Sequence, residues 1–362
     1  MQPTLTRRSA LAAVFTAVLA LGALPAALPA AQAAPPPGAW TAAAVPALTA
    51  PSSLHGVAAP DPAHAFAVGM EAKETVPVLL RTVNGVWTRD PAPAGIAPKL
   101  VDVAAGSASN VWAVGQRALD DRVPARAVHW NGRRWKPVEL PLLTPMAVSV
   151  DSAGKPWVTG VNVNESDGSA VYRRRGGTWE KSLDLPPGTT LSAIAARSPR
   201  DVWAGGLASS STDPTALYHF DGTAWTRVEW PGTWSRWVMQ IAPVSAREAW
   251  FYEMPLDPLF SGPALVHWKD GVFTEHKIPA PGSGGLTAQV ADPGFLGDIT
   301  LDGAGGVWLQ NNRENAFLHF DGTSWTRVAK PSTSGYLWDL ARVPHTRTVW
   351  AAGDSGALLR FG

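Results

Sequence analysis

The chain has 362 residues and a formal net charge of +1; 46% of its residues are hydrophobic and none is cysteine. The lack of cysteine excludes disulfide bonds, thiolate metal sites and a cysteine nucleophile. A charge this close to neutral gives no basic footprint for nucleic acid or an acidic membrane surface, so we expect neither as a partner.

The first 33 residues read as an export signal. Arg7 and Arg8 precede an apolar stretch over 10–24, and residues 31–33 (Ala-Gln-Ala) form a small-residue cleavage site. The two arginines partly match a twin-arginine motif but lack its usual aromatic residue, so general secretion and twin-arginine export both stay open.

Cleavage would leave residues 34–362 as one mature domain. Loss of Arg7 and Arg8 lowers the basic count from 30 to 28 against 29 acidic residues, a charge of −1. No later segment holds 18 unbroken apolar residues, so we expect no membrane-spanning helix. We expect a secreted, extracellular, monomeric protein, and the Ala- and Pro-rich composition without disulfides is compatible with a bacterial source.

The mature chain repeats one phrase about every 46 residues, with two aromatic positions in each copy. The first aromatic residue falls at Phe66, Trp112, Trp157, Trp203, Trp250, Trp308 and Trp350. The second falls at Trp40, Trp87, Trp135, Trp179, Trp225, Phe273 and Trp325. A period in this range with several short strands per copy is typical of a β-propeller blade.

In chain order, each copy predicts four strands. In the second copy these are residues 100–104, 111–114, 127–130 and 135–139, with an Asn-Gly hairpin before the last strand. A Gly- and Pro-rich insertion over 278–295 predicts a loop between blades five and six.

The ends of the chain predict how the ring closes. The last copy stops at its third strand, and residues 38–41 at the mature N-terminus read as the missing fourth strand. A strand supplied by the other terminus removes the free sheet edges. The sequence therefore predicts an all-β, seven-bladed β-propeller of four-stranded blades, closed by the mature N-terminus as the outer strand of the last blade.

Residues 201–206, followed by 217–222 and Trp225, resemble a kelch repeat through their glycine doublet and the tryptophan of the fourth strand. Similar repeats form the propeller of galactose oxidase, and tectonin-type lectins use comparable Val-Trp phrases. The resemblance implies the fold. It does not imply the oxidase chemistry, which needs a tyrosine cross-linked to cysteine beside copper.

Four histidines recur at one third-strand position, namely His129, His219, His267 and His319. Radial repetition spreads them around the ring, so they cannot share one metal ion. We expect a structural role, with hydrogen bonds to the neighbouring blade. No phosphate loop, dinucleotide fingerprint or His-Glu-x-x-His motif is present.

Function is better sought where the repeat is broken. One such place is the start of the inner strands, where the blades carry in turn Gly56, Asp102, Ala147, Ala193, Gln240, Asp298 and Asp339. Gln240, Asp298 and Asp339 come from neighbouring blades, and His55 and Trp338 lie one position earlier on adjacent strands. Such carboxylates could bind Ca²⁺ or divide acid and base roles; the simpler reading, which we favour, is a polar lining of a water-filled channel.

The second place is the loop face, where blades connect. Residues 230–237 carry three tryptophans and an arginine, and the candidate ligand-binding residues here are Trp234, Arg236, Trp237, Tyr252, Glu253 and Trp338. Exposed aromatic rings beside polar groups suit a sugar. The alternative is that Trp230 and Trp237 only fill the gap between two blades.

Two functions follow from these features. The first is a secreted, non-catalytic propeller that binds a glycan, a cell-wall polymer or a protein through its loop face, without a cofactor unless Ca²⁺ takes part. The second is a propeller-type glycan lyase or hydrolase at the channel mouth, which would use Asp298 and Asp339 with His55 or Arg236.

Overall fold

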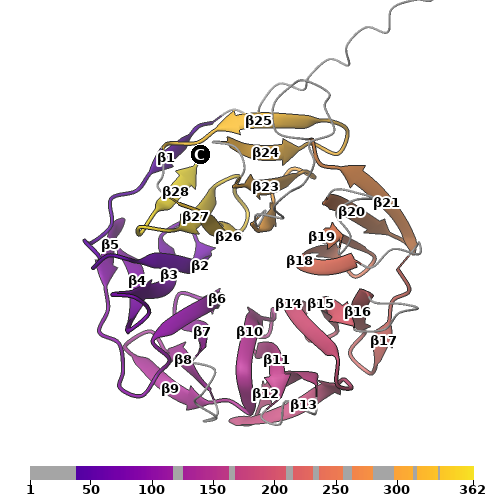
Figure 1. Ribbon diagram of the computed structural model, residues 1–362, viewed down its shortest axis with the longest axis horizontal. Coiled ribbons are helices and arrows are strands. Elements are labelled where there is room, and N and C mark those ends of the chain that lie inside the picture. The colour runs from indigo at the N-terminus through magenta and orange to yellow at the C-terminus, as the bar shows by residue number, and fades with distance from the viewer. Residues whose placement is uncertain are drawn as a thin grey trace, which may run out of the picture. The chain divides into compact units, whose positions relative to one another are not determined.

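The computed structural model describes residues 38–116, 125–162, 168–208, 215–230, 236–255, 263–279, 297–312, 316–332 and 335–362. These residues form seven four-stranded antiparallel sheets arranged as a ring (Figure 1), which confirms the predicted seven-bladed propeller. The predicted signal peptide and most of the predicted 278–295 loop lie outside the described residues. Within the described part of the chain, no helix has the length and apolar character that a bilayer crossing requires.

Four consecutive strands build each of the first six blades, in sequence order from the centre of the ring outward (Figure 1). Blades one to three contain β2 (Ser53–Asp61), β3 (His64–Glu71), β4 (Val76–Val83), β5 (Val86–Arg89), β6 (Lys99–Ser107), β7 (Asn110–Gln116), β8 (Arg126–Trp130), β9 (Trp135–Glu139), β10 (Leu142–Val150), β11 (Pro156–Asn162), β12 (Ser169–Arg175) and β13 (Thr178–Asp184). Blades four to six contain β14 (Thr189–Ser198), β15 (Asp201–Ala208), β16 (Thr215–Phe220), β17 (Trp225–Arg227), β18 (Arg236–Ser245), β19 (Glu248–Pro255), β20 (Ala264–Lys269), β21 (Val272–Lys277), β22 (Ile299–Leu301), β23 (Val307–Asn311), β24 (Ala316–Phe320) and β25 (Trp325–Ala329).

Blade seven joins the two ends of the described chain. It consists of β26 (Leu337–Arg342), β27 (Val349–Gly353), β28 (Leu358–Phe361) and, on its outer edge, β1 (Trp40–Ala42). Trp40 pairs with Phe361 in this ladder, and its ring stacks on Phe317 of blade six with the centroids 3.7 Å apart. The predicted closure strand is therefore present, and its tryptophan also packs against the next blade.

The core lies between the blades rather than inside them. Seven clusters of buried side chains occur among the described residues, and each is shared by two adjacent blades. Trp203 of blade four shows the pattern: it is fully buried and makes edge contacts with Phe251 and Trp268 of blade five, at 5.3 and 5.0 Å between centroids. Such aromatic pairs contribute about 0.5–1.5 kcal/mol beyond the buried area, so the repeated tryptophans hold the ring together.

Glycine recurs at the end of the second strand in most copies of the repeat. Five blades place glycine there, at Gly69, Gly115, Gly160, Gly206 and Gly353. A Cβ on Gly206 would lie 1.9 Å from the carbonyl oxygen of Thr190, because the bulged inner strand passes close to this point. The same position is Glu253 in blade five and Asn311 in blade six, so these two blades break the rule.

The four repeated histidines are structural, but the expected hydrogen bond to the neighbouring blade is wrong. The ring of His219 stacks on Trp203 with centroids 4.2 Å apart, and its Nε2 lies 2.8 Å from Asp201 Oδ1 in the same blade. The other three contact Asn110, Glu248 and Asp302 of their own blades. Antiparallel pairing places the third-strand histidine opposite the second-strand tryptophan, so the turn before that strand supplies the nearest polar group.

Candidate functional site

The inner-strand aspartates are used as clamps between blades. Asp102 accepts the N–H of Val103 at 2.7 Å on one carboxylate oxygen and the N–H of Val148, in blade three, at 2.7 Å on the other. A β-bulge just before Asp102 interrupts the strand ladder, and such bulges disturb the local pairing of backbone groups. The carboxylate supplies acceptors there and joins two blades.

The other two aspartates repeat this arrangement. Asp298 binds the N–H groups of Ile299 (2.7 Å) and Leu340 (3.0 Å), and Asp339 binds those of Leu340 (2.9 Å) and Val57 (2.6 Å). Among the described residues, the inner-strand aspartates thus bridge three junctions, between blades two and three, six and seven, and seven and one.

Asp298 and Asp339 are also brought together, as neighbouring blades predict. Their carboxyl groups interact through a side-chain hydrogen bond, which affects the pKa of both. Burial raises the pKa of Asp298 to about 6 and, with the charge of Asp298, raises the pKa of Asp339 well above its usual value. Burial and then the charge of Asp339 raise the pKa of Asp102 to about 7. The three acids therefore form an electrostatically coupled arc around the channel.

Gln240 and Asp298 line one cavity of about 330 Å³ in the channel, together with Ser149 and Arg342. Gln240 is therefore near Asp298, as expected. Among the described residues, no three His, Asp or Glu side chains form a group that could hold a metal ion. The possible Ca²⁺ site at Gln240, Asp298 and Asp339 stays a prediction.

The loop face is the end of the ring where the inner strands begin and the second strands end. Trp234, our leading candidate there, lies outside the described residues. Arg236 and Glu253 do not face solvent: they are 7% and 0% exposed and form an ion pair, and Arg236 also reaches Glu275 at 3.3 Å. Burial raises the pKa of Glu253 to about 8, and Arg236 offsets part of that cost.

Two aromatic candidates in the same region are also internal. Tyr252 is fully buried in the core between blades five and six, so the expected exposed ring is absent at this position. Trp237 is half-buried, and its indole N–H donates to Ser192 of blade four at 2.8 Å. Trp230 makes an edge contact with Phe251 of blade five. These tryptophans fill the gap between blades four and five, which was the simpler interpretation.

Among the described residues, the accessible aromatic side chains of the loop face lie where blades seven and one meet. Tyr336 is 44% exposed, and its ring centroid is 5.9 Å from that of Trp338. Trp338 in turn lies 5.3 Å from the His55 ring. His55 and Trp338 are both bulge residues of their inner strands, and a bulge re-aims a side chain.

Asp354 holds this group in place and was missed by the sequence reasoning. It accepts the indole N–H of Trp338 at 2.7 Å, the hydroxyl of Ser53 at 2.8 Å and the backbone N–H of Tyr336 at 2.9 Å. It also forms an isolated β-bridge with Ser53, so it ties blade seven to blade one. The available signal was an acid directly after Gly353, where no other blade has one after its glycine.

The imidazole of His55 completes the group. Its Nε2 is buried and has no hydrogen-bond partner among the described residues. Burial, and next the charge of Lys99, lower the pKa of His55 to about 4, so the ring is neutral at pH 7. The carboxylates of Asp354 and Glu74 act on the pKa of His55 in the opposite direction and raise it. The catalytic trio of His55, Asp298 and Asp339 stays a prediction.

Comparison with known proteins supports the propeller fold and identifies no family for this chain. No family model matches the chain, and neither does any curated protein. Among solved structures, YCF48 bound to a D1 peptide is 16% identical with a TM-score of 0.63, over 91% of this chain and 99% of that one. Virginiamycin B lyase from Staphylococcus aureus is 15% identical with a TM-score of 0.65, over 90% of this chain and 99% of that one.

A third similar structure is the GH74 xyloglucanase from Xanthomonas campestris. It is 15% identical with a TM-score of 0.61, over 89% of this chain and 53% of that one. The names of these three proteins indicate different functions, and their sequence identities to this chain are low. The chain therefore has the architecture of a seven-bladed β-propeller, a fold that hosts many functions.

Proposed function

We propose that this protein is a secreted, non-catalytic β-propeller that binds an extracellular glycan through its loop face. The observation that carries the proposal is the group formed by Tyr336, Trp338, His55 and Asp354 at the junction of blades seven and one. It combines an exposed phenol ring with an indole fixed by a carboxylate. Flat rings beside polar groups suit the apolar faces and hydroxyls of sugars.

The inner aspartates favour binding over catalysis. Asp102, Asp298 and Asp339 each use both carboxylate oxygens to accept backbone N–H groups from two blades. A general acid or base must present its carboxyl to a substrate, and these are engaged in holding the ring. The glycan lyase or hydrolase stays the second candidate, because the raised pKa values of Asp298 and Asp102, about 6 and 7, lie in the range that acid–base chemistry uses.

Export rests on the sequence of residues 1–33, and the kelch-like repeat class on residues 201–225. A secreted propeller meets polysaccharides and proteins outside the cell. The presence of a peptide-bound structure among the similar folds keeps a protein ligand as the other outcome of the test.

The test is binding of the mature chain, residues 34–362, to a glycan array and to insoluble cell-wall polymers, with and without Ca²⁺. We expect retention on one polymer class, and a loss of tenfold or more in affinity for Tyr336→Ala and Trp338→Ala, since stacked aromatic anchors dominate such contacts. Trp234→Ala tests the remaining loop candidate in parallel.

Val272→Ala is the matched control, because Val272 is 64% exposed on the β20–β21 hairpin of blade five. Unchanged binding in Tyr336→Ala and Trp338→Ala would remove the proposed site. Retention of a protein from culture fluid, with no polysaccharide retained, would replace the glycan by a protein ligand.

A further inference from the structure

A cavity of about 590 Å³ opens at the opposite end of the strands from the loop face, between blades seven and one. Its polar and aromatic lining consists of His64, Arg81, Thr82, Asn84, Trp350 and Arg360. The volume is within the usual range of small-molecule sites.

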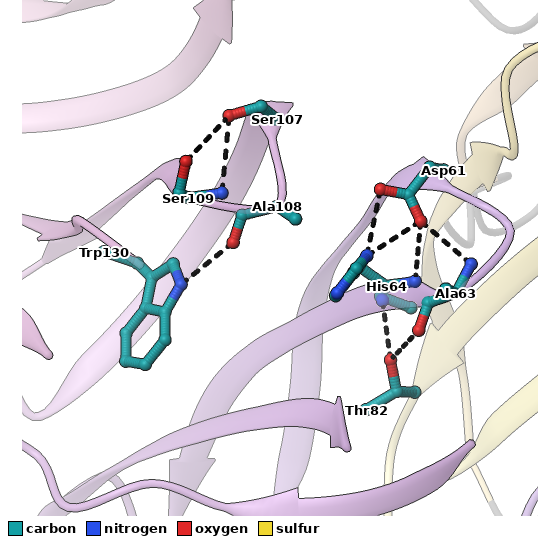
Figure 2. A network of polar contacts seen from close by, with 9 residues as sticks. Asp61, Ala63, His64, Thr82, Ser107, Ala108, Ser109 and Trp130 are labelled. Carbon is teal, nitrogen blue, oxygen red and sulfur yellow. Dashed lines mark hydrogen bonds and ion pairs between the residues drawn. The ribbon is translucent and has the colours of Figure 1, made fainter. Parts of the chain in front are cut away.

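One wall of the cavity is a rigid turn (Figure 2). Asp61 accepts the backbone N–H groups of Ala63 and His64 at 2.8 and 3.0 Å, and its carboxylate contacts the His64 ring. The hydroxyl of Thr82 donates to the carbonyl of Ala63 at 3.1 Å and accepts the N–H of Ala65 at 2.9 Å. These bonds fix the shape of the wall before any ligand arrives.

The third strand places a cationic or imidazole side chain opposite the second-strand aromatic residue in every blade. In ring order these are Arg81, His129, Arg173, His219, His267, His319 and Arg360. The first six each contact a carboxylate or amide oxygen, from Asp90, Asn110, Glu180, Asp201, Glu248 and Asp302 respectively.

Arg360 of blade seven is the exception. Among the described residues no acidic side chain lies within ion-pair distance of it, and its guanidinium sits over the Trp350 ring at 5.9 Å. Two residues before the second-strand aromatic residue, blade four has Asp201 and blade five has Glu248, whereas blade seven has Thr348. Blade seven therefore lacks the acid that pairs with the third-strand side chain in blades four and five.

We propose that this cavity is a second binding site, which takes an acidic sugar residue and holds its carboxylate or sulfate group on Arg360. A guanidinium binds such oxyanions through two parallel N–H groups. The exposed Asn84 amide supplies hydrogen bonds for hydroxyls, and the half-buried Trp350 supplies an apolar surface. The site is separate from the loop face, so this proposal does not depend on the proposed glycan site there.

The test is calorimetric titration of the mature chain with trigalacturonate, a sulfated trisaccharide, neutral galactotriose and inorganic sulfate. We expect binding of at least one acidic saccharide, weakened by added salt, and little binding of the neutral one. Arg360→Gln should lose about tenfold to a hundredfold in affinity, since a hydrogen bond between charged groups is worth that factor. Arg133→Gln, at an exposed arginine of the blade-two hairpin, is the control and should bind as wild type.

Thr348→Glu is the sharper variant, because it gives blade seven the acid that blade five carries at the equivalent position. It should pair with Arg360 and abolish binding of the acidic saccharide, while circular dichroism and the melting temperature stay unchanged. Equal affinity for neutral and acidic saccharides, or undiminished affinity in both Arg360→Gln and Thr348→Glu, would overturn the proposal. Binding of inorganic sulfate without any saccharide would overturn the ligand class.

Discussion

Blades five and seven both depart from the repeat, and they do so in different ways. In blade five, Glu253 replaces the glycine at the end of the second strand, and the buried Arg236 pairs with it. In blade seven, Tyr336 lies exposed beside Trp338 at one end, and Arg360 has no acidic partner among the described residues at the other. In blade five the substituted residues Glu253 and Arg236 interact with each other inside the protein, whereas in blade seven the side chains stay accessible to a ligand.

The two blades show how a position that departs from the repeat should be interpreted. A substituted position indicates a binding site only when its side chain remains accessible and its hydrogen-bonding or stacking capacity is not used internally. Charge and aromaticity alone do not decide this, because blade five has both and buries them. The predictions below test the two blades against each other.

The largest effect is expected from breaking the ion pair of blade five. Above pH 8, where Glu253 is ionised, Arg236→Leu leaves its charge buried without a cation, and removal of one partner of a buried ion pair costs about 3–5 kcal/mol of unfolding free energy. Urea denaturation followed by circular dichroism measures this. The double variant Arg236→Leu/Glu253→Gln should recover most of the loss, and Arg236→Leu alone at wild-type stability would show that the pair is not buried in solution.

A smaller loss is expected at the clamp of blade seven. Asp339→Ala removes the acceptor of the Val57 N–H, and a buried unsatisfied donor costs about 1–3 kcal/mol. The Leu340 N–H loses one of its two acceptors and still donates to Asp298. Equilibrium unfolding should therefore show a net loss of about 1–3 kcal/mol. A stability equal to wild type would mean that water satisfies the Val57 amide equally well.

The same acids predict a pH dependence. Since the pKa values of Asp298 and Asp102 are raised to about 6 and 7, their contribution to stability is complete below about pH 4 and is lost as the pH rises through those values. Asp298→Asn cannot release this proton. The unfolding free energy of the variant minus that of wild type should therefore become more positive from pH 4 to pH 7, because only wild type loses stability over this range. A constant difference would contradict the raised pKa of Asp298.

The smallest effect on stability is expected at the exposed side of blade seven. Tyr336→Ala and Arg360→Gln remove accessible side chains, so each should change the unfolding free energy by less than about 0.5 kcal/mol. Thermal denaturation beside Arg236→Leu checks this contrast. A large loss in either variant would show that blade seven uses these residues structurally, as blade five uses Arg236.

The architecture was predictable because it follows from chain-wide regularities. The period of the aromatic residues gives the blades, and the strand missing after Phe361 and present at Trp40 gives the closure. The proximity of Asp298 and Asp339 also followed, since equivalent positions of adjacent blades must be neighbours. These inferences need only the topology of the ring.

The candidate site was less predictable because it depends on side-chain direction. Tyr252 and Glu253 are consecutive strand residues, so their side chains point to opposite faces of the blade. Nothing in the sequence around them shows that both faces are covered and both side chains buried. The bulges that aim His55 and Trp338 at each other leave no pattern in the residue types. Asp354 follows a glycine and stands in no recognised motif, and its hydrogen-bond partners Trp338 and Ser53 lie 16 and 301 positions away in the sequence.

The most direct measurement is the affinity of the mature chain for the polysaccharide class that it retains, compared between wild type and Tyr336→Ala with Val272→Ala as control. The account predicts a loss of tenfold or more in Tyr336→Ala at unchanged melting temperature, and wild-type affinity in Val272→Ala. Wild-type affinity in a correctly folded Tyr336→Ala would contradict the claim that the accessible departure in blade seven is where this protein binds its ligand.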